Sequence, residues 1–67
     1  MRKNIEAERG RMGLSKVAIS AALNITTKTY NGYVEGKPIP SDILIAMANM
    51  FDCSVDYLLG LNHTRTA

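Results

Sequence analysis

The chain has 67 residues, of which 46% are hydrophobic and 21% are charged, and its formal net charge is +2. This length allows one small domain with a thin core, and the apolar content is too high for an intrinsically disordered chain. No apolar run approaches the roughly 20 residues of a membrane span, and the basic start MRKN leads into charged sequence rather than a signal-peptide core. We therefore expect a cytoplasmic protein stabilised by helix packing.

The charges are unevenly distributed along the chain. Residues 1–37 carry seven Lys or Arg against three Glu, a charge of +4, whereas residues 38–67 carry one Arg against three Asp, a charge of −2. A basic half can bind a polyanion such as nucleic acid, although ordinary solvated charge explains such an imbalance about as often. The single cysteine, Cys53, excludes an internal disulfide, and zinc-site spacing is absent.

Two helices are predicted in the first third of the chain. Residues 2–12 show an apolar stripe with helical spacing, and Gly13 follows as a typical C-cap. Ser15 is the expected N-cap of a second helix, KVAISAAL, within which Ser20 is tolerated if its hydroxyl bonds the carbonyl four residues earlier. Asn24 then tolerates the left-handed backbone of a tight turn better than other non-glycine residues.

The next stretch, NITTKTYNGYVEG (24–36), has two interpretations. Its Asn31-Gly32 dipeptide and β-branched flanks are typical of a β-hairpin, but an isolated hairpin is marginally stable and no other segment supplies a strand partner. A helix capped by Thr26 instead sends both tyrosines and Val34 to one side, although the glycine costs up to about 1 kcal/mol. We favour a helix over about 26–35, with an outward face of Thr27, Lys28 and Asn31.

Two more helices are predicted in the second half. Ser41 is the expected N-cap of DILIAMANMF, whose apolar residues follow the helical period, and both prolines are confined to the preceding loop. Ser54 is expected to cap a short last helix, VDYLL, which stops at Gly60, and residues 61–67 are expected to form a frayed tail. The predicted fold class is all-α, with five helices in one domain over residues 1–60.

Arranged in this way, the chain resembles the phage-repressor-type helix-turn-helix family, which includes lambda repressor, Cro and the XRE-like regulators. The resemblance covers about residues 4–60 and implies a compact five-helix domain with the helix-turn-helix at about 15–36. It is similar above all to short single-domain regulators of prophages and mobile elements in low-GC Gram-positive bacteria. The matching pieces are NIEAERGRMGLS, Asn24-Ile25-Thr26, Lys28-Thr29-Tyr30, Tyr33 to Lys37, Ile39-Pro40-Ser41 and CSVDYLLG.

The resemblance implies how the chain would bind DNA. In this family the second helix crosses the DNA backbone and the third enters the major groove of double-stranded DNA. The side chains expected to read bases are Thr27, Lys28 and Asn31, whose groups suit thymine, guanine and adenine respectively. Those expected to contact phosphates are Lys16, Thr26, Thr29, Tyr33 and Lys37.

Three positions depart from the family pattern at the recognition helix. Gly32 stands where the family often has a long polar DNA-contacting side chain, and Glu35 replaces a phosphate-contacting asparagine. Val34 replaces a glutamate that often pairs with the arginine of the first helix, here Arg9. We predict that Arg9 pairs with Glu35 or another acid such as Glu6, or stays solvated.

The expected function is sequence-specific binding of double-stranded DNA by a transcriptional regulator, most simply a repressor. The alternative is a protein-interaction module on the same fold, such as an anti-repressor or antitoxin-like partner with weak DNA binding, which Gly32 and Glu35 favour. One recognition helix offers few base contacts, so we expect a homodimer, at least on DNA. Its expected interface residues are Met50, Phe51, Tyr57 and Leu61.

Catalysis is not expected, because the one histidine, His63, lies in the tail and the carboxylates do not converge with Cys53 in a recognisable site. The expected protein is therefore a non-enzyme with no cofactor, no metal and no small-molecule ligand. Cys53 itself is expected to be buried and inert.

Overall fold

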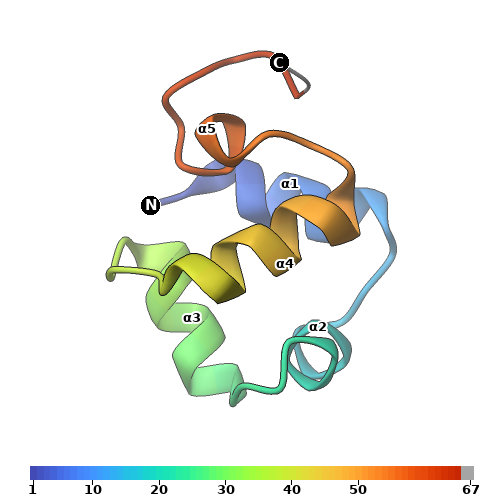
Figure 1. Ribbon diagram of the computed structural model, residues 1–67. Coiled ribbons are helices and arrows are strands. Elements are labelled where there is room, and N and C mark those ends of the chain that lie inside the picture. The colour runs from blue at the N-terminus through green and yellow to red at the C-terminus, as the bar shows by residue number, and fades with distance from the viewer. Residues whose placement is uncertain (66–67) are drawn as a thin grey trace.

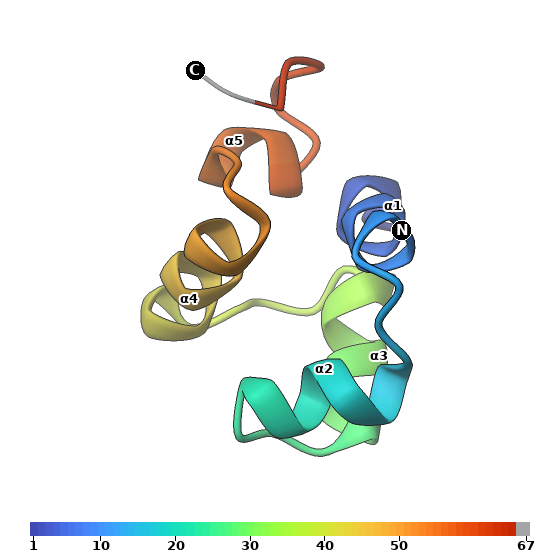
Figure 2. The same ribbon diagram turned by 90° about the vertical axis from the view of Figure 1, so that its right-hand side faces the viewer.

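The computed structural model describes residues 1–65, and over this range the chain is helical with no strand. The helices are α1 (Lys3–Arg11), α2 (Lys16–Ala22), α3 (Thr27–Glu35), α4 (Ser41–Phe51) and α5 (Val55–Leu58). In Figures 1 and 2, α2 and α3 form one end of the molecule, α5 and the C-terminal segment form the other, and α1 and α4 lie between them. The predicted all-α fold is confirmed over the described residues.

Three of the four predicted N-caps are confirmed. The hydroxyls of Ser15, Thr26 and Ser54 accept hydrogen bonds from the backbone N–H three residues later, at 3.0 to 3.1 Å. The fourth prediction is wrong, because Ser41 is the first residue of α4 and Pro40 is its N-cap. The Pro40 carbonyl already accepts the first helical bond from the Leu44 N–H at 3.0 Å, so the helix begins one residue earlier than the sequence indicated.

The stretch at 24–36 is a turn and a helix rather than a hairpin. Asn24 has a left-handed φ of 56°, as predicted, and the Ile25 N–H donates to the carbonyl of Ser20 at 2.9 Å, which closes α2 before α3 begins. Tyr30 in the middle of α3 is fully buried, and Val34 is 8% exposed. Burial of these side chains overrides the poor helix propensity of the threonines and the glycine.

The core is built from apolar side chains of all five helices. It includes two residues that the sequence had assigned to a dimer interface, since Phe51 is fully buried and Tyr57 is 8% exposed. That assignment is therefore wrong for these two, because α4 and α5 turn them inward against the rest of the domain. The core residues are Ile5, Ile19, Leu23, Tyr30, Val34, Met47, Phe51, Tyr57 and Leu58.

Ser20 on α2 does not meet the condition under which it would be tolerated, a hydrogen bond from its hydroxyl to the carbonyl four residues earlier. It is 2% exposed, and its hydroxyl has no hydrogen-bond partner among residues 1–65. A buried hydroxyl without a partner loses its bonds to water and gains none in return, which makes it destabilising. Ser20 is thus an unfavourable polar position inside the core of the α2–α3 end.

The C-terminal segment folds back onto the domain. The carbonyl of Arg65 accepts a hydrogen bond from the Ser54 N–H at 2.7 Å, and the guanidinium of Arg65 donates to Glu8 on α1. The expected frayed tail at 61–67 therefore does not describe residues 61–65, while residues 66–67 lie outside the described residues. No helix within the described range is long and apolar enough to span a membrane.

Candidate nucleic-acid interface

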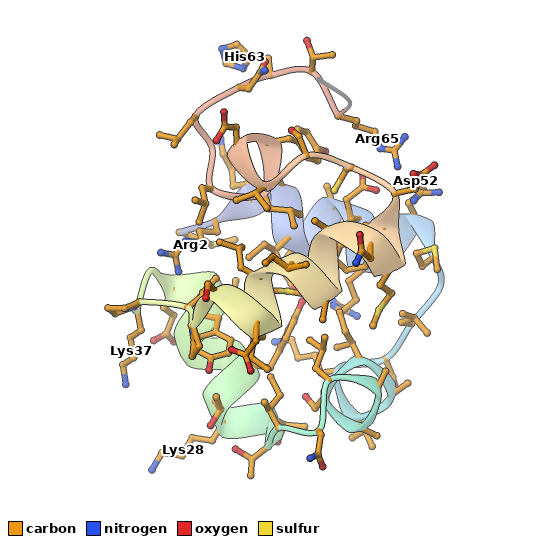
Figure 3. All side chains as sticks on the ribbon, in the orientation of Figure 1. Arg2, Lys28, Lys37, Asp52, His63 and Arg65 are labelled. Atoms are coloured by element: carbon orange, nitrogen blue, oxygen red, sulfur yellow. The ribbon has the colours of Figure 1, made fainter. Side chains whose placement is uncertain are left out.

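The outer face of α3 presents the three predicted base-reading side chains together. Thr27 and Lys28 are exposed, and Asn31 is half-buried. In Figure 3 the Lys28 side chain projects away from the body of the molecule at the start of α3. The opposite face of the same helix is buried in the core, so α3 separates an anchored side from a polar side that a ligand can reach.

The predicted phosphate contacts lie around this face but are not equivalent. Lys16, Thr26 and Lys37 are exposed, whereas Thr29 and Tyr33 are half-buried. The Thr26 hydroxyl accepts from the Thr29 N–H at 3.1 Å and donates to the Thr29 hydroxyl at 3.0 Å. Its proton is thereby engaged, while the Thr29 proton stays available to an acceptor such as a phosphate oxygen. The two hydroxyls are therefore coupled, with Thr26 also capping α3.

A polar network holds α3 against α1. The Tyr30 hydroxyl donates to Glu6 at 2.5 Å, and Arg9 binds the same carboxylate through two nitrogens at 2.9 and 3.1 Å. Arg9 also donates to the Leu14 carbonyl at 2.7 Å. Of the predicted outcomes for Arg9 (pairing with Glu35, pairing with another acid such as Glu6, or solvation), the structure shows pairing with Glu6. Glu6 on α1 thus takes the place of the family glutamate that Val34 removes.

The protonation states of this network are fixed by its own contacts. The Arg9 hydrogen bonds hold the pKa of Glu6 below its ordinary value, although partial burial opposes them. Burial, reinforced by the Glu6 carboxylate, raises the pKa of the Tyr30 hydroxyl. Tyr30 is therefore a donor and Glu6 an acceptor throughout the neutral range, and the orientation of α3 does not depend on a group that titrates near pH 7.

Arg2 secures the C-terminal end of α3, a role that the sequence did not reveal. Its backbone N–H donates to the Val34 carbonyl at 2.6 Å, and its Nη1 donates to the carbonyls of Tyr33 at 2.7 Å and Lys37 at 2.6 Å. A cation at a helix C-terminus satisfies carbonyls that lack helical partners and complements the helix dipole. The only signal in the sequence was the presence of a basic residue ahead of the first helix.

A shallow hollow of about 330 Å³ lies beside the outer face of α3. Two lysines, a threonine and a tyrosine are among its lining residues, together with Gly32. Figure 3 shows Lys28 and Lys37 projecting from the same side of the molecule. The lining residues are Lys28, Thr29, Gly32, Tyr33, Lys37 and Pro38.

A second polar cluster lies at the opposite end of the domain, around Glu8. This carboxylate is 2% exposed and accepts from Arg11 at 2.9 Å and from Arg65 at 2.9 and 3.0 Å. Tyr57 also donates to it at 3.3 Å, and both arginines bind the Phe51 carbonyl. Burial acts to raise the pKa of Glu8, but the Arg65 and Arg11 hydrogen bonds outweigh it and lower the pKa overall. The cluster anchors the C-terminal segment.

The remaining chemical groups do not assemble a reactive site in the described range. Cys53 is half-buried, rather than fully buried as expected, and burial raises the pKa of its thiol, which favours the unreactive protonated form. His63 is exposed. Within residues 1–65, no three His, Cys, Asp or Glu side chains lie close enough to hold a metal ion.

Comparison with known proteins identifies the family of this arrangement. The profile of the family described as Helix-turn-helix matches residues 5–58, which include all five helices except the first two residues of α1. The chain belongs to the XRE-like helix-turn-helix family. Over 49 residues, or 72% of this chain, it is 39% identical to an uncharacterized HTH-type transcriptional regulator, YobD, of Bacillus subtilis (strain 168). The chain spans 44% of the length of that protein. No solved structure matches the chain.

The family assignment relates α2 and α3 to the two helices of a helix-turn-helix motif. In a helix-turn-helix, the first helix of the motif crosses the DNA backbone and the second is the recognition helix. Here α2 and α3 are these two helices, joined by the turn at Asn24. In motifs of this kind, the second helix directs its polar face to the major groove.

Proposed function

We propose that the protein is a sequence-specific, double-stranded DNA-binding transcriptional regulator of the repressor type that acts in the cytoplasm. The observation that carries this proposal is the two-sided character of α3. Its inner face is fixed by Tyr30 and Val34, while its outer face leaves Thr27 and Lys28 exposed. A rigid helix with an accessible polar face can read base edges without a large loss of conformational freedom.

The base-reading assignment follows from the chemistry of three side chains. Lys28 can donate to guanine O6 and N7, Asn31 can form a paired contact with adenine N6 and N7, and the Thr27 methyl can meet a thymine methyl. Each well-formed pair discriminates against a wrong base by about 1–3 kcal/mol. Three such contacts give limited specificity for one protomer, which is why we propose that two copies bind together.

The phosphate contacts are proposed to come from the rim of the same face. Lys16 stands at the start of α2, where the helix terminus supplies additional N–H donors, and Lys37 follows the end of α3. Thr29 and Tyr33 lie between them on α3. Thr26 is retained in the proposal mainly as the residue that fixes the first turn of α3, because its hydroxyl is already engaged.

Homodimerisation is part of the proposal, with a revised surface. Met50 is half-buried and Leu61 is 75% exposed, so these two remain candidates once Phe51 and Tyr57 are removed to the core. Ile45 on α4 is 55% exposed and extends the set. A dimer would place two copies of α3 in successive major grooves roughly 34 Å apart. Sedimentation with DNA should show two protomers per site, and one protomer per site would contradict a dimer.

The deciding experiment is selection of bound sites from a random duplex library, followed by titration of the selected site in increasing salt. The proposal predicts enrichment of two related half-sites and an affinity that falls steeply with salt, as counterion release requires. Lys3→Met is a matched charge control for Lys28→Met, because Lys3 is exposed near Leu59, Gly60 and His63 rather than beside α3. Failure of the wild type to bind duplex DNA even in dilute buffer would favour the protein-interaction module instead.

A further inference from the structure

We infer that Gly32 and Arg2 are positioning residues for Lys37, which they hold beside α3 as a pre-placed contact for a DNA phosphate. This inference rests on the proposed DNA-binding function. It gives Gly32 a role in placing Lys37, although its lack of a side chain also removes a DNA contact that the family often has at this position. It also connects the N-terminal segment to the recognition surface.

The backbone of Lys37 is held from both sides. Gly36 has a φ of 124°, a conformation that side-chain-bearing residues rarely adopt, and it turns the chain back along the last turn of α3. The Lys37 N–H then donates to the Gly32 carbonyl at 2.9 Å, while the Lys37 carbonyl accepts from Arg2 Nη1 at 2.6 Å. The same Arg2 nitrogen binds the Tyr33 carbonyl at 2.7 Å, so residue 37 is tied to α3 through the guanidinium.

The side chain of Lys37 lies in the space that Gly32 leaves open. A Cβ atom built on Gly32 would stand 3.0 Å from Lys37 Cδ and 3.8 Å from its Cγ and Cε, and these are its three nearest neighbours. Gly32 is buried although it faces the outer side of α3, as expected for a backbone covered by an aliphatic stem. A Cβ at position 32 would crowd the lysine stem, and a longer side chain would occupy the volume that the stem now fills.

This placement gives the lysine a functional advantage. A free lysine side chain samples many rotamers and loses that freedom when it binds, whereas a stem already packed on α3 loses less. The ammonium of Lys37 projects on the same side as that of Lys28 (Figure 3), beside the hollow that Thr29 and Tyr33 also line. A phosphate bound beside this hollow would lie near the Lys37 ammonium and the hydroxyl groups of Thr29 and Tyr33.

The test is a double-mutant cycle with Gly32→Leu and Lys37→Met, measured as affinity for random-sequence duplex DNA over a range of salt concentrations. Lys37→Met should lower affinity by about fivefold to tenfold at 0.1 M salt and reduce the salt slope by about 0.9 per protomer, the loss of one phosphate contact. Gly32→Leu should cause a loss of similar size, since it displaces the lysine stem. In the Lys37→Met background, Gly32→Leu should have no further effect.

Two further variants sharpen the cycle. Gly32→Ala, whose Cβ only crowds the lysine stem, should fall between wild type and Gly32→Leu, and Arg2→Met should weaken binding only when Lys37 is present. Circular dichroism should show that both Gly32 variants are folded, because Ala and Leu favour helix over Gly. The same measurement checks that Arg2→Met is folded. Equal losses from Gly32→Leu with and without Lys37 would overturn the inference while leaving DNA binding intact. Absence of DNA binding by the wild type would remove the proposed function and this inference with it.

Discussion

The α2–α3 end of the domain and the opposite end, where α5 and residues 61–65 meet α1, use charged side chains for different purposes. At the opposite end, Arg11 and Arg65 bind Glu8 and the Phe51 carbonyl. At the α2–α3 end, Lys16, Lys28 and Lys37 are exposed, and their ammonium groups make no hydrogen bond or ion pair within residues 1–65. The planar fork of arginine suits fixed carboxylate pairs, whereas the lysine ammonium can bind phosphate as a compact point charge.

The two ends are joined through α1, which supplies one carboxylate to each. Glu6 holds α3 through Tyr30, and Glu8 holds the C-terminal segment through Arg65. The side chains that build the fold and those that are available to DNA are therefore largely separate. The separation can be tested with two kinds of variant. Changes to the carboxylate networks should affect stability, and changes to the lysines should affect DNA affinity.

Acid should have the largest effect on stability, since it disrupts both networks at once. The pKa values of Glu6 and Glu8 are lowered from 4.5 by their arginine partners, so the stabilisation is complete above that pH and is lost as the pH falls through the lower folded-state values. Urea unfolding at a series of pH values should show a steep decline below pH 4.5. A free energy of unfolding that stays flat into that range would contradict the assigned pairs.

Glu8→Ala should lower the free energy of unfolding by about 2 kcal/mol, because it removes a buried carboxylate with several charge-assisted hydrogen bonds. It should also release the C-terminal segment, seen as faster hydrogen exchange at the Ser54 N–H, which Arg65 now binds. Arg65→Met is the matched variant and should speed the same exchange with a smaller loss of stability. Unchanged exchange in both variants would show that the segment is held by other contacts.

Much of this architecture is predictable from local sequence signals. Ser15, Thr26, Ser54 and Asn24 act on their near neighbours, so their roles follow from the sequence alone. The side-chain partners of Arg2 and Arg65 lie 14 to 57 residues away, and only the tertiary packing brings them together. The apolar stripes of α4 and α5 identify a buried face but cannot distinguish a monomer core from a dimer interface.

The helical period of α3 places Thr27, Lys28 and Asn31 on one outward face, and the base-reading role of that face is what the family resemblance implies. The role proposed for Gly32, leaving room for the Lys37 stem, does not follow from helical periodicity. It depends on where the Lys37 side chain lies after the chain reverses at Gly36, and periodicity does not predict that position.

Tyr30→Phe should lower the free energy of unfolding by about 1.5 kcal/mol, since it removes a hydrogen bond to a charged acceptor and leaves Glu6 with one partner fewer. Thermal or urea unfolding measures the effect. DNA affinity should fall as well, because α3 loses its link to α1. Tyr33→Phe is the control on the same helix, as its hydroxyl makes no hydrogen bond within the described residues, and it should leave stability unchanged. Equal effects of the two variants on stability would argue against the network.

Ser20→Ala should give the smallest change and the opposite sign, raising the free energy of unfolding by about 1 kcal/mol through removal of an unpaired buried hydroxyl. Ser41→Ala provides a comparison at an exposed position that forms no cap, and its effect should lie near zero. A loss of stability in Ser20→Ala would show that the hydroxyl makes a favourable interaction.

The most direct test compares Lys28→Ala with Lys3→Ala on the DNA site selected by the wild type. Both variants remove one positive charge, but only Lys28 lies on the outer face of α3. Lys28→Ala should weaken binding by about tenfold or more and abolish the preference at one position of each half-site, while Lys3→Ala should leave the preference intact. Equal loss of affinity with unchanged sequence preference in both variants would contradict the claim that α3 reads the DNA.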